Sequence, residues 1–156
     1  MIFEKARTDD MEQLVKLRLA YLMEDMGNLN EKERSAIEQG LPDYFQRNLN
    51  HNIFCYVARK EQEIVACAFL LVVEKPMSPA FLTGKTGTVL NVYTKPEDRR
   101  GGYARKLMEL LMEDAVEKGL STVELKATES GYSLYKLLGF EDDITKYHLM
   151  KWVNRQ

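Results

Sequence analysis

The feature that most constrains the fold is a helix-forming segment that lies between two strand-forming segments in the second half of the chain. Its apolar side chains follow the 3.6-residue period of an amphipathic helix: Ala104, Leu107, Met108, Leu111 and Ala115. Gly119 follows as a C-cap, and the flanking runs Thr88–Thr94 and Thr122–Ala127 are typical of strands. A strand-helix-strand unit within one sheet makes a right-handed crossover between parallel strands. The segment therefore predicts a parallel strand pair joined by a helix.

Four further runs are rich in apolar and β-branched residues and predict strands: Ile2–Arg7, Ile53–Arg59, Ile64–Val73 and Thr145–Val153. The two middle runs flank the polar segment Lys60–Glu63, which favours an antiparallel hairpin. The predicted sheet is therefore mixed, antiparallel in the first half and parallel around the long helix. A chain of 156 residues fits one α/β (α+β) domain over residues 1–156.

Three other segments predict helices. The first starts at a cap on Thr8 or Asp9 and ends near Gly27, and the second starts at a cap on Asn30. Gly40 and Pro42 interrupt the second segment, which predicts two short helical pieces between Asn30 and Asn50. A short helix is expected over Ser130–Leu138, where Gly139 ends it.

Charge and composition exclude several classes of protein. The net charge is only −2 with signs alternating along the chain, so no basic surface for nucleic acid is expected. The start of the chain, Met1–Asp10, lacks the apolar core of a signal peptide, and no apolar run approaches the ~20 residues of a membrane span. Cys55 and Cys67 lie in apolar runs without a nearby histidine, which predicts core thiols and no metal site. A cytoplasmic location is expected.

The turn between the third strand and the long helix has the composition of an anion site. It consists of Arg99, Arg100, Gly101, Gly102, Tyr103, Ala104 and Arg105. The first amides of a helix lack intrahelical partners and carry the positive end of the dipole, and glycine lets a ligand approach the backbone closely. No GKS or GKT sequence and no GxGxxG sequence is present, so neither a P-loop nor a dinucleotide fingerprint is indicated. The alternative is a tight glycine turn with solvated arginines.

Two motifs resemble the GCN5-related N-acetyltransferase (GNAT) superfamily. The segment Leu90–Leu111 resembles its motif A, in which Arg99, Gly102 and Ala104 fill the R/QxxGxG/A signature. Leu134–Phe140, reading LYKLLGF, resembles the LYxxxGF element of motif B. The resemblance implies a central mixed, mostly antiparallel sheet of six to seven strands flanked by about four helices, and a small bacterial-type enzyme.

The resemblance also implies how acetyl-CoA binds. The backbone amides of Arg100–Arg105 would hold the pyrophosphate, with Arg99 in the same turn, and Val92, Tyr93 and Thr94 would pair with the pantetheine arm like an added strand. The amide of Val92 would polarise the thioester carbonyl. Thr128 lies where many relatives carry asparagine, in motif B, and is expected to contribute to the coenzyme site. No metal is implied.

The expected leaving-group residue is Tyr135, which matches the family tyrosine that hydrogen-bonds the departing sulfur. A phenol, with a pKa of about 10, is a weaker acid than a thiol, with a pKa of about 8.5. Tyr135 is therefore expected to stabilise the leaving thiolate first and to donate a proton to it second. The alternative is an amphipathic core tyrosine. Gly131 replaces the alanine of the common motif B.

Two further residues are candidates with a plain alternative each. Glu74 is the nearest candidate base if its carboxylate is partly buried at the strand end; otherwise it is a solvated charge. Thr88 stands where histone-modifying relatives carry a glutamate. Deprotonation of the amine through water is therefore the default hypothesis. Arg18, on the apolar stripe of the first helix, would bind an acceptor carboxylate, or else snorkel or pair internally.

Together these patterns predict an acetyl-CoA-dependent N-acetyltransferase. The acceptor is expected to be a primary amine of a small molecule: an amino acid, a polyamine or an amine antibiotic. Acetylation of a protein or peptide amine, and a non-catalytic acyl-CoA sensor, remain alternatives. Partners other than acetyl-CoA and the amine are not expected, except for a second copy of the chain through an exposed sheet edge.

Overall fold

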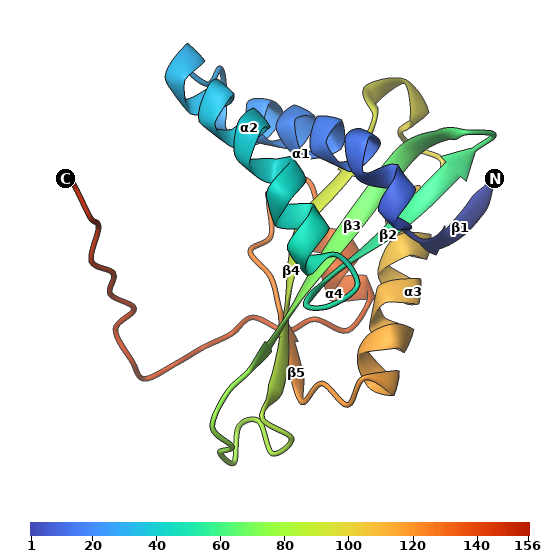
Figure 1. The fold of residues 1–156 in the computed structure, drawn as a ribbon. Helices are drawn as coiled ribbons and strands as arrows, with labels where there is room; N and C mark the ends of the chain where they lie inside the picture. Colours follow the sequence, from blue (N-terminus) through green and yellow to red (C-terminus); the bar gives the residue numbers. More distant parts are fainter. The chain divides into compact units, whose positions relative to one another are not determined.

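The computed structural model describes residues 1–156, which form two compact units, Met1–Lys126 and Ala127–Gln156 (Figure 1). The first unit holds the whole sheet, whose strands lie side by side in the order β1 (Ile2–Lys5), β2 (Ile53–Lys60), β3 (Glu63–Glu74), β4 (Lys85–Thr94) and β5 (Thr122–Glu124). β1 to β4 pair antiparallel, and β4 and β5 pair parallel. The mixed sheet and its parallel pair are confirmed, with five strands in place of six to seven.

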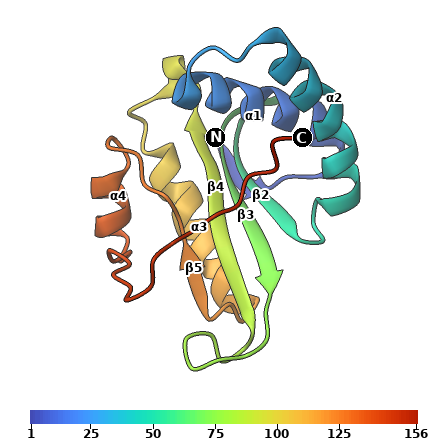
Figure 2. The same ribbon diagram turned by 90° about the vertical axis from the view of Figure 1, so that its left-hand side faces the viewer.

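Three helices cover the sheet: α1 (Met11–Met26), α2 (Glu31–Asn48) and α3 (Tyr103–Glu117). Alternation along β2 explains how the two faces are filled. Cys55 and Val57 pack in the cluster that includes Leu14 of α1 and Phe45 of α2, whereas the Tyr56 hydroxyl donates to Asp114 of α3. α1 and α2 therefore lie on one face and α3 on the other (Figure 2).

α2 corrects the prediction of two short pieces, because it is one continuous helix with Pro42 inside it. Pro42 removes the helical hydrogen bond to the carbonyl of Glu38, and both residues are exposed, so water is available to that carbonyl. Phe45, only 1% exposed, anchors the second half of the helix in the core. The predicted cap is confirmed: the Asn30 side chain accepts from the amide of Glu33 at 2.8 Å, and Glu33 accepts from the amide of Asn30.

The second unit contains one short helix, α4 (Tyr132–Leu137), and no strand. The predicted strand at Thr145–Val153 is therefore wrong. A strand needs a neighbour for its backbone hydrogen bonds, and residues 127–156 contain no other strand. The assignment of the chain to a single domain stays a prediction. No helix of the chain is both long enough and apolar enough to cross a membrane.

Candidate acetyl-coenzyme A site

The turn before α3 has an unusual backbone that only some residues tolerate. Arg100 and Gly102 both adopt the left-handed region, with φ of 71° and 76°. A Cβ atom on Gly101 would lie 2.9 Å from the Tyr103 ring, so this position accepts no side chain without a shift of the ring. Two different constraints, conformation at Gly102 and space at Gly101, therefore explain the glycine pair.

The N-terminus of α3 is open to an anion. No side chain caps it and no acidic residue lies in its first turn, and the first helical hydrogen bond runs from Lys106 N–H to the Gly102 carbonyl at 3.3 Å. The amides of Tyr103, Ala104 and Arg105 thus precede that bond without a helical acceptor. α2, by contrast, closes its N-terminus with a capping box. The free amides and the helix dipole fit an oxygen-rich anion such as a pyrophosphate.

The three arginines of the turn have different environments. Arg100 is exposed and pairs with no residue of the chain, whereas Arg105 donates to Glu109 at 3.0 Å. Arg99 donates to Glu24 of α1 at 2.6 Å and to the Thr94 carbonyl at 2.9 Å, and its guanidinium carbon lies 5.5 Å from the centre of the Tyr93 ring. Its side chain therefore joins the turn to α1.

The strand that leads into this turn is unpaired along part of one edge. β5 pairs only with Thr86, Gly87 and Thr88, so β4 has no partner strand on that side from Val89 to Thr94 (Figure 2). Such an edge presents backbone groups to an extended ligand. The predicted pantetheine-binding residues Val92, Tyr93 and Thr94 all lie on it.

A β-bulge lies near the C-terminal end of the same strand. The register changes from Phe69↔Leu90 to Cys67↔Tyr93, so Asn91 and Val92 together oppose a single residue of β3. Asn91 has φ of 55°. Of the four non-glycine residues with positive φ, two, Asn91 and Arg100, thus fall at the candidate site, where backbone strain commonly concentrates.

The Asn91 side chain holds the bulge in place. It is 3% exposed, its oxygen accepts from Arg18 at 3.2 Å, and its nitrogen donates to the Cys67 sulfur at 3.5 Å. The Cys67 thiol donates to the Asn91 carbonyl at 3.6 Å. The sequence patterns alone assigned no role to Asn91, although a polar amide within an apolar strand was a signal for one.

A family model for the acetyltransferase (GNAT) family matches residues 19–140. The chain belongs to this family. GNAT members transfer acetyl groups from acetyl-CoA, and the chain is therefore an acetyl-CoA-dependent N-acetyltransferase. None of the curated protein sequences compared with it matches significantly.

Solved structures share the fold over nearly the whole GNAT chain. A predicted acetyltransferase from Clostridium acetobutylicum, solved with acetyl-CoA, is 26% identical with a TM-score of 0.83, and the match covers 96% of this chain and 95% of that one. A GCN5-related N-acetyltransferase from Ralstonia eutropha is 24% identical with a TM-score of 0.78, covering 96% and 97%. A ribosomal-protein-alanine N-acetyltransferase from Brucella melitensis is 18% identical with a TM-score of 0.70, covering 97% and 100%.

Motif B of this GNAT chain lies in the second unit, around α4. A Cβ atom on Gly131 would lie 2.9 Å from the Tyr135 ring, which explains glycine in place of the family's alanine. Tyr135 is half-buried and packs edge-on against Phe140, with ring centres 6.0 Å apart. The Thr128 hydroxyl accepts from the Gly131 amide at 3.2 Å, so its side chain stabilises the start of α4.

The structure argues against Glu74 as the base. Its side chain is exposed, whereas the role of a base was expected only for a partly buried carboxylate. Glu74 also pairs with Lys85, the first residue of β4, whereas Val92 lies seven residues further along. At ~3.3 Å per residue this is a separation of roughly 23 Å. We therefore leave Glu74 out of the proposed site.

Neither cysteine has the environment of a nucleophile. Burial raises the pKa of Cys67 to about 12, against a smaller lowering by the hydrogen bond with Asn91. Burial also raises the pKa of Cys55 well above its ordinary value. Both groups are neutral thiols in the core, as predicted, and the thiolate form needed for acyl transfer is disfavoured.

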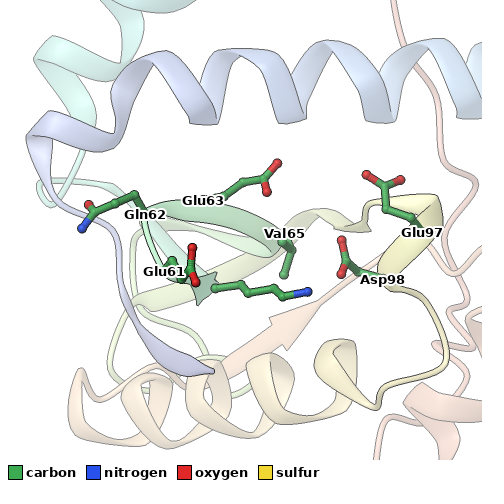
Figure 3. Close-up of a pocket in the computed structure, with 7 residues that line it drawn as sticks. Glu61, Gln62, Glu63, Val65, Glu97 and Asp98 are labelled. Atoms are coloured by element: carbon green, nitrogen blue, oxygen red, sulfur yellow. The ribbon is translucent and has the colours of Figure 1, made fainter.

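An acidic hollow of about 390 Å³ lies between the β2–β3 turn and the short turn Pro96–Asp98 (Figure 3). Glu61, Glu63, Glu97 and Asp98 contribute four carboxylates to its lining, against one lysine, Lys60. This charge repels phosphate, so the hollow does not suit a coenzyme. The uncapped start of α3 remains the part of the first unit that suits the pyrophosphate.

Proposed function

We propose that the protein acetylates a primary amine of a small molecule, with an amino acid, a polyamine or an amine antibiotic as the acceptor class. One observation carries the coenzyme part of the proposal: the unpaired edge of β4 is followed, after the short turn Pro96–Asp98, by the open amides of α3. A helix N-terminus suits a pyrophosphate and a free strand edge suits an amide-containing arm. The two together match the two chemical parts of coenzyme A.

In this proposal the chain binds acetyl-CoA mainly through its backbone. The amides of Gly101 to Arg105 hold the pyrophosphate, and the exposed Arg100 adds a positive charge. Val92, Tyr93 and Thr94 pair with the pantetheine arm along the free edge of β4. Arg99 acts indirectly, because its contacts with Glu24 and Thr94 fix the position of the turn.

The reaction is a direct transfer. The neutral amine attacks the thioester carbonyl carbon, the carbon–sulfur bond breaks, and the amine proton passes to water. The amide of Val92, at the bulge, donates to the carbonyl oxygen as negative charge develops there. Tyr135 donates a hydrogen bond to the leaving sulfur. Asn91 is not the base, because an amide does not titrate and its side chain is already bound to Arg18 and Cys67.

The deciding experiment is a thiol-release assay with acetyl-CoA across amino acids, polyamines, aminoglycosides and peptides, with Tyr135→Phe beside the wild type. The proposal expects turnover on one small-molecule class and a kcat at least tenfold lower in the variant. Turnover on peptides alone would replace the small molecule by a protein amine. Coenzyme binding without turnover on any amine would instead support a non-catalytic acyl-CoA sensor.

A further inference from the structure

Arg18 of α1 occupies a place in the fold that its internal contacts do not explain. Its guanidinium donates to the Asn91 side-chain oxygen at 3.2 Å, and it forms no ion pair. The other half-buried or buried arginine side chain of the first unit, Arg59, is neutralised by Glu4 and Asp10. Arg18 is half-buried and therefore keeps an uncompensated positive charge beside the bulge of β4.

The nearest carboxylates on the same helix do not bind Arg18. Glu24 is bound to Arg99, and Asp25 forms no ion pair with any residue. Glu12, near the start of α1, pairs instead with Lys16 on the exposed side of the helix. A partly desolvated guanidinium without a carboxylate gains strongly from an anion, since each of its N–H groups can donate to a carboxylate oxygen.

Two tyrosines share this environment, Tyr21 of α1 and Tyr44 of α2. Burial raises the pKa of each phenol, the negative charge of Asp25 adds to the rise at Tyr21, and the positive charge of Arg18 opposes the rise in both. The charge of Arg18 therefore acts on half-buried residues of both helices. The two phenols stay protonated, so they can donate hydrogen bonds, as the guanidinium does. The surroundings thus favour an acceptor of hydrogen bonds with negative charge.

We propose that Arg18 binds a carboxylate of the acceptor, so that the preferred acceptors are small amines that also carry a carboxylate. The inference rests on the proposed function. Arg18 contacts Asn91, the neighbour of Val92 whose amide is proposed to hold the thioester oxygen. A carboxylate on Arg18 would therefore hold the amine of an amino acid close to the acyl group. Polyamines, which carry only positive charge, would be repelled at the same place.

The test compares matched acceptors that differ only in the carboxylate. Each amino acid of a panel is assayed beside its decarboxylated amine and its carboxamide, with acetyl-CoA saturating. The wild type is expected to show a kcat/KM at least tenfold higher for the amino acid than for either analogue. Equal or faster turnover of the decarboxylated amines would overturn the carboxylate proposal while leaving the acetyltransferase activity in place.

The variant Arg18→Gln removes the charge and keeps a hydrogen-bond donor for Asn91. The preference for the carboxylate is expected to fall to less than threefold, mainly through a higher KM of the amino acid, with the KM of acetyl-CoA unchanged. Arg34→Gln, which removes an exposed arginine of α2 paired with Glu38, is the control and should keep the preference. A uniform loss of activity on all acceptors in Arg18→Gln would contradict specific carboxylate binding.

A binding measurement covers the case in which no acceptor is turned over. Calorimetric titration of the protein and coenzyme A with N-acetylated amino acids probes the same contact from the product side. Binding that weakens at least tenfold in Arg18→Gln and is retained in Arg34→Gln would support the carboxylate site independently of turnover. Absence of binding to every N-acetylated amino acid would overturn it.

Discussion

Individual residues of the turn before α3 combine backbone conformation with ligand binding, and substitutions can separate the two. Gly102 has φ of 76°, and a Cβ atom added there would meet no other atom within 4 Å, so alanine at this position encounters conformational strain and no clash. Gly119, at the other end of α3, has φ of 71° and equally open space. The two positions therefore form a matched pair in which only Gly102 belongs to the proposed site.

Gly102→Ala is expected to lower the free energy of unfolding by about 1 kcal/mol, because an L-residue is disfavoured in the left-handed region. The same substitution shifts the amides that hold the pyrophosphate, and acetyl-CoA binding should weaken at least tenfold. Gly119→Ala should lower stability to a similar extent and leave binding unchanged. Denaturant unfolding and calorimetry measure the two effects. Equal affinity in the two variants would remove Gly102 from the coenzyme site.

A substitution at Arg100 should weaken coenzyme binding without the loss of stability expected for Gly102→Ala. Asparagine tolerates the left-handed region better than arginine, so Arg100→Asn should keep or raise stability, by up to about 1 kcal/mol. Loss of the exposed charge should weaken acetyl-CoA binding threefold to tenfold, with a smaller effect at high salt. Glu61→Asn, at φ of 57° in the β2–β3 turn, is the control for the stability gain alone. An Arg100→Asn protein that binds coenzyme as the wild type does would show that this charge is not used.

At the scale of elements, buried ion pairs connect the strands to the helices. Arg59 of β2 donates to both carboxylate oxygens of Asp10, which directly precedes α1, at 2.9 Å each. Burial alone would raise the pKa of Asp10, but hydrogen bonds from Arg59 and from the Arg7 amide outweigh it, and the net pKa lies below the ordinary value. The folded state therefore binds this proton less readily than the unfolded chain does.

The sign of the pH dependence follows from that lowering. The pair contributes its full stability above the unfolded pKa of about 4, and the contribution is lost as the pH falls through the lower pKa of the folded state. The urea midpoint should thus be flat near neutral pH and fall below about pH 4. Asp10→Asn should cost about 1.5 to 3 kcal/mol at pH 7, since buried Arg59 loses the two hydrogen bonds to Asp10 and keeps Glu4 as its remaining carboxylate partner. Below about pH 4 the urea midpoint of Asp10→Asn should also fall less steeply with pH than that of the wild type. If the two midpoints fall equally steeply, groups other than Asp10 cause the loss of stability in acid.

The elements that the sequence predicts well are those with a strong local pattern. The period of α3, the glycines of the turn and the apolar runs of β2 to β4 are each sufficient without tertiary information. The bulge at Asn91 and the Arg99–Glu24 contact are different, because they depend on which residue of another element lies opposite. The local sequence therefore revealed neither the bulge at Asn91 nor the contact between Arg99 and α1.

The continuous α2 and the absent last strand fail for a related reason. Pro42 lowers the helical tendency locally, but the burial of Phe45 in the core overrides it. Thr145–Val153 has strand composition, yet a strand forms only with a neighbour, and composition does not specify one. In both segments the tertiary surroundings determined the structure: they kept α2 helical through Pro42 and left residues 145–153 without a strand.

At the scale of the whole molecule, burial is distributed unevenly between the two units. Every buried residue lies between Ala6 and Ala115, inside the first unit, and the second unit has none. Its last segment exposes apolar side chains instead, including Leu149 at 91% and Trp152 at 82%. The sheet and the core of the first unit are thus complete without residues 127–156, whereas Tyr135 belongs to the second unit.

Truncation after Lys126 tests whether this division is also functional. The remaining chain is expected to unfold cooperatively, because it keeps the sheet and the core, and to retain acetyl-CoA binding through the turn before α3 within about tenfold. Its kcat should fall further than that of Tyr135→Phe, since the whole of motif B is missing. Circular dichroism melts, calorimetry and thiol release measure the three quantities. A truncated chain without a cooperative transition would instead show that residues 1–126 need residues 127–156 to fold, as expected for a single domain over residues 1–156.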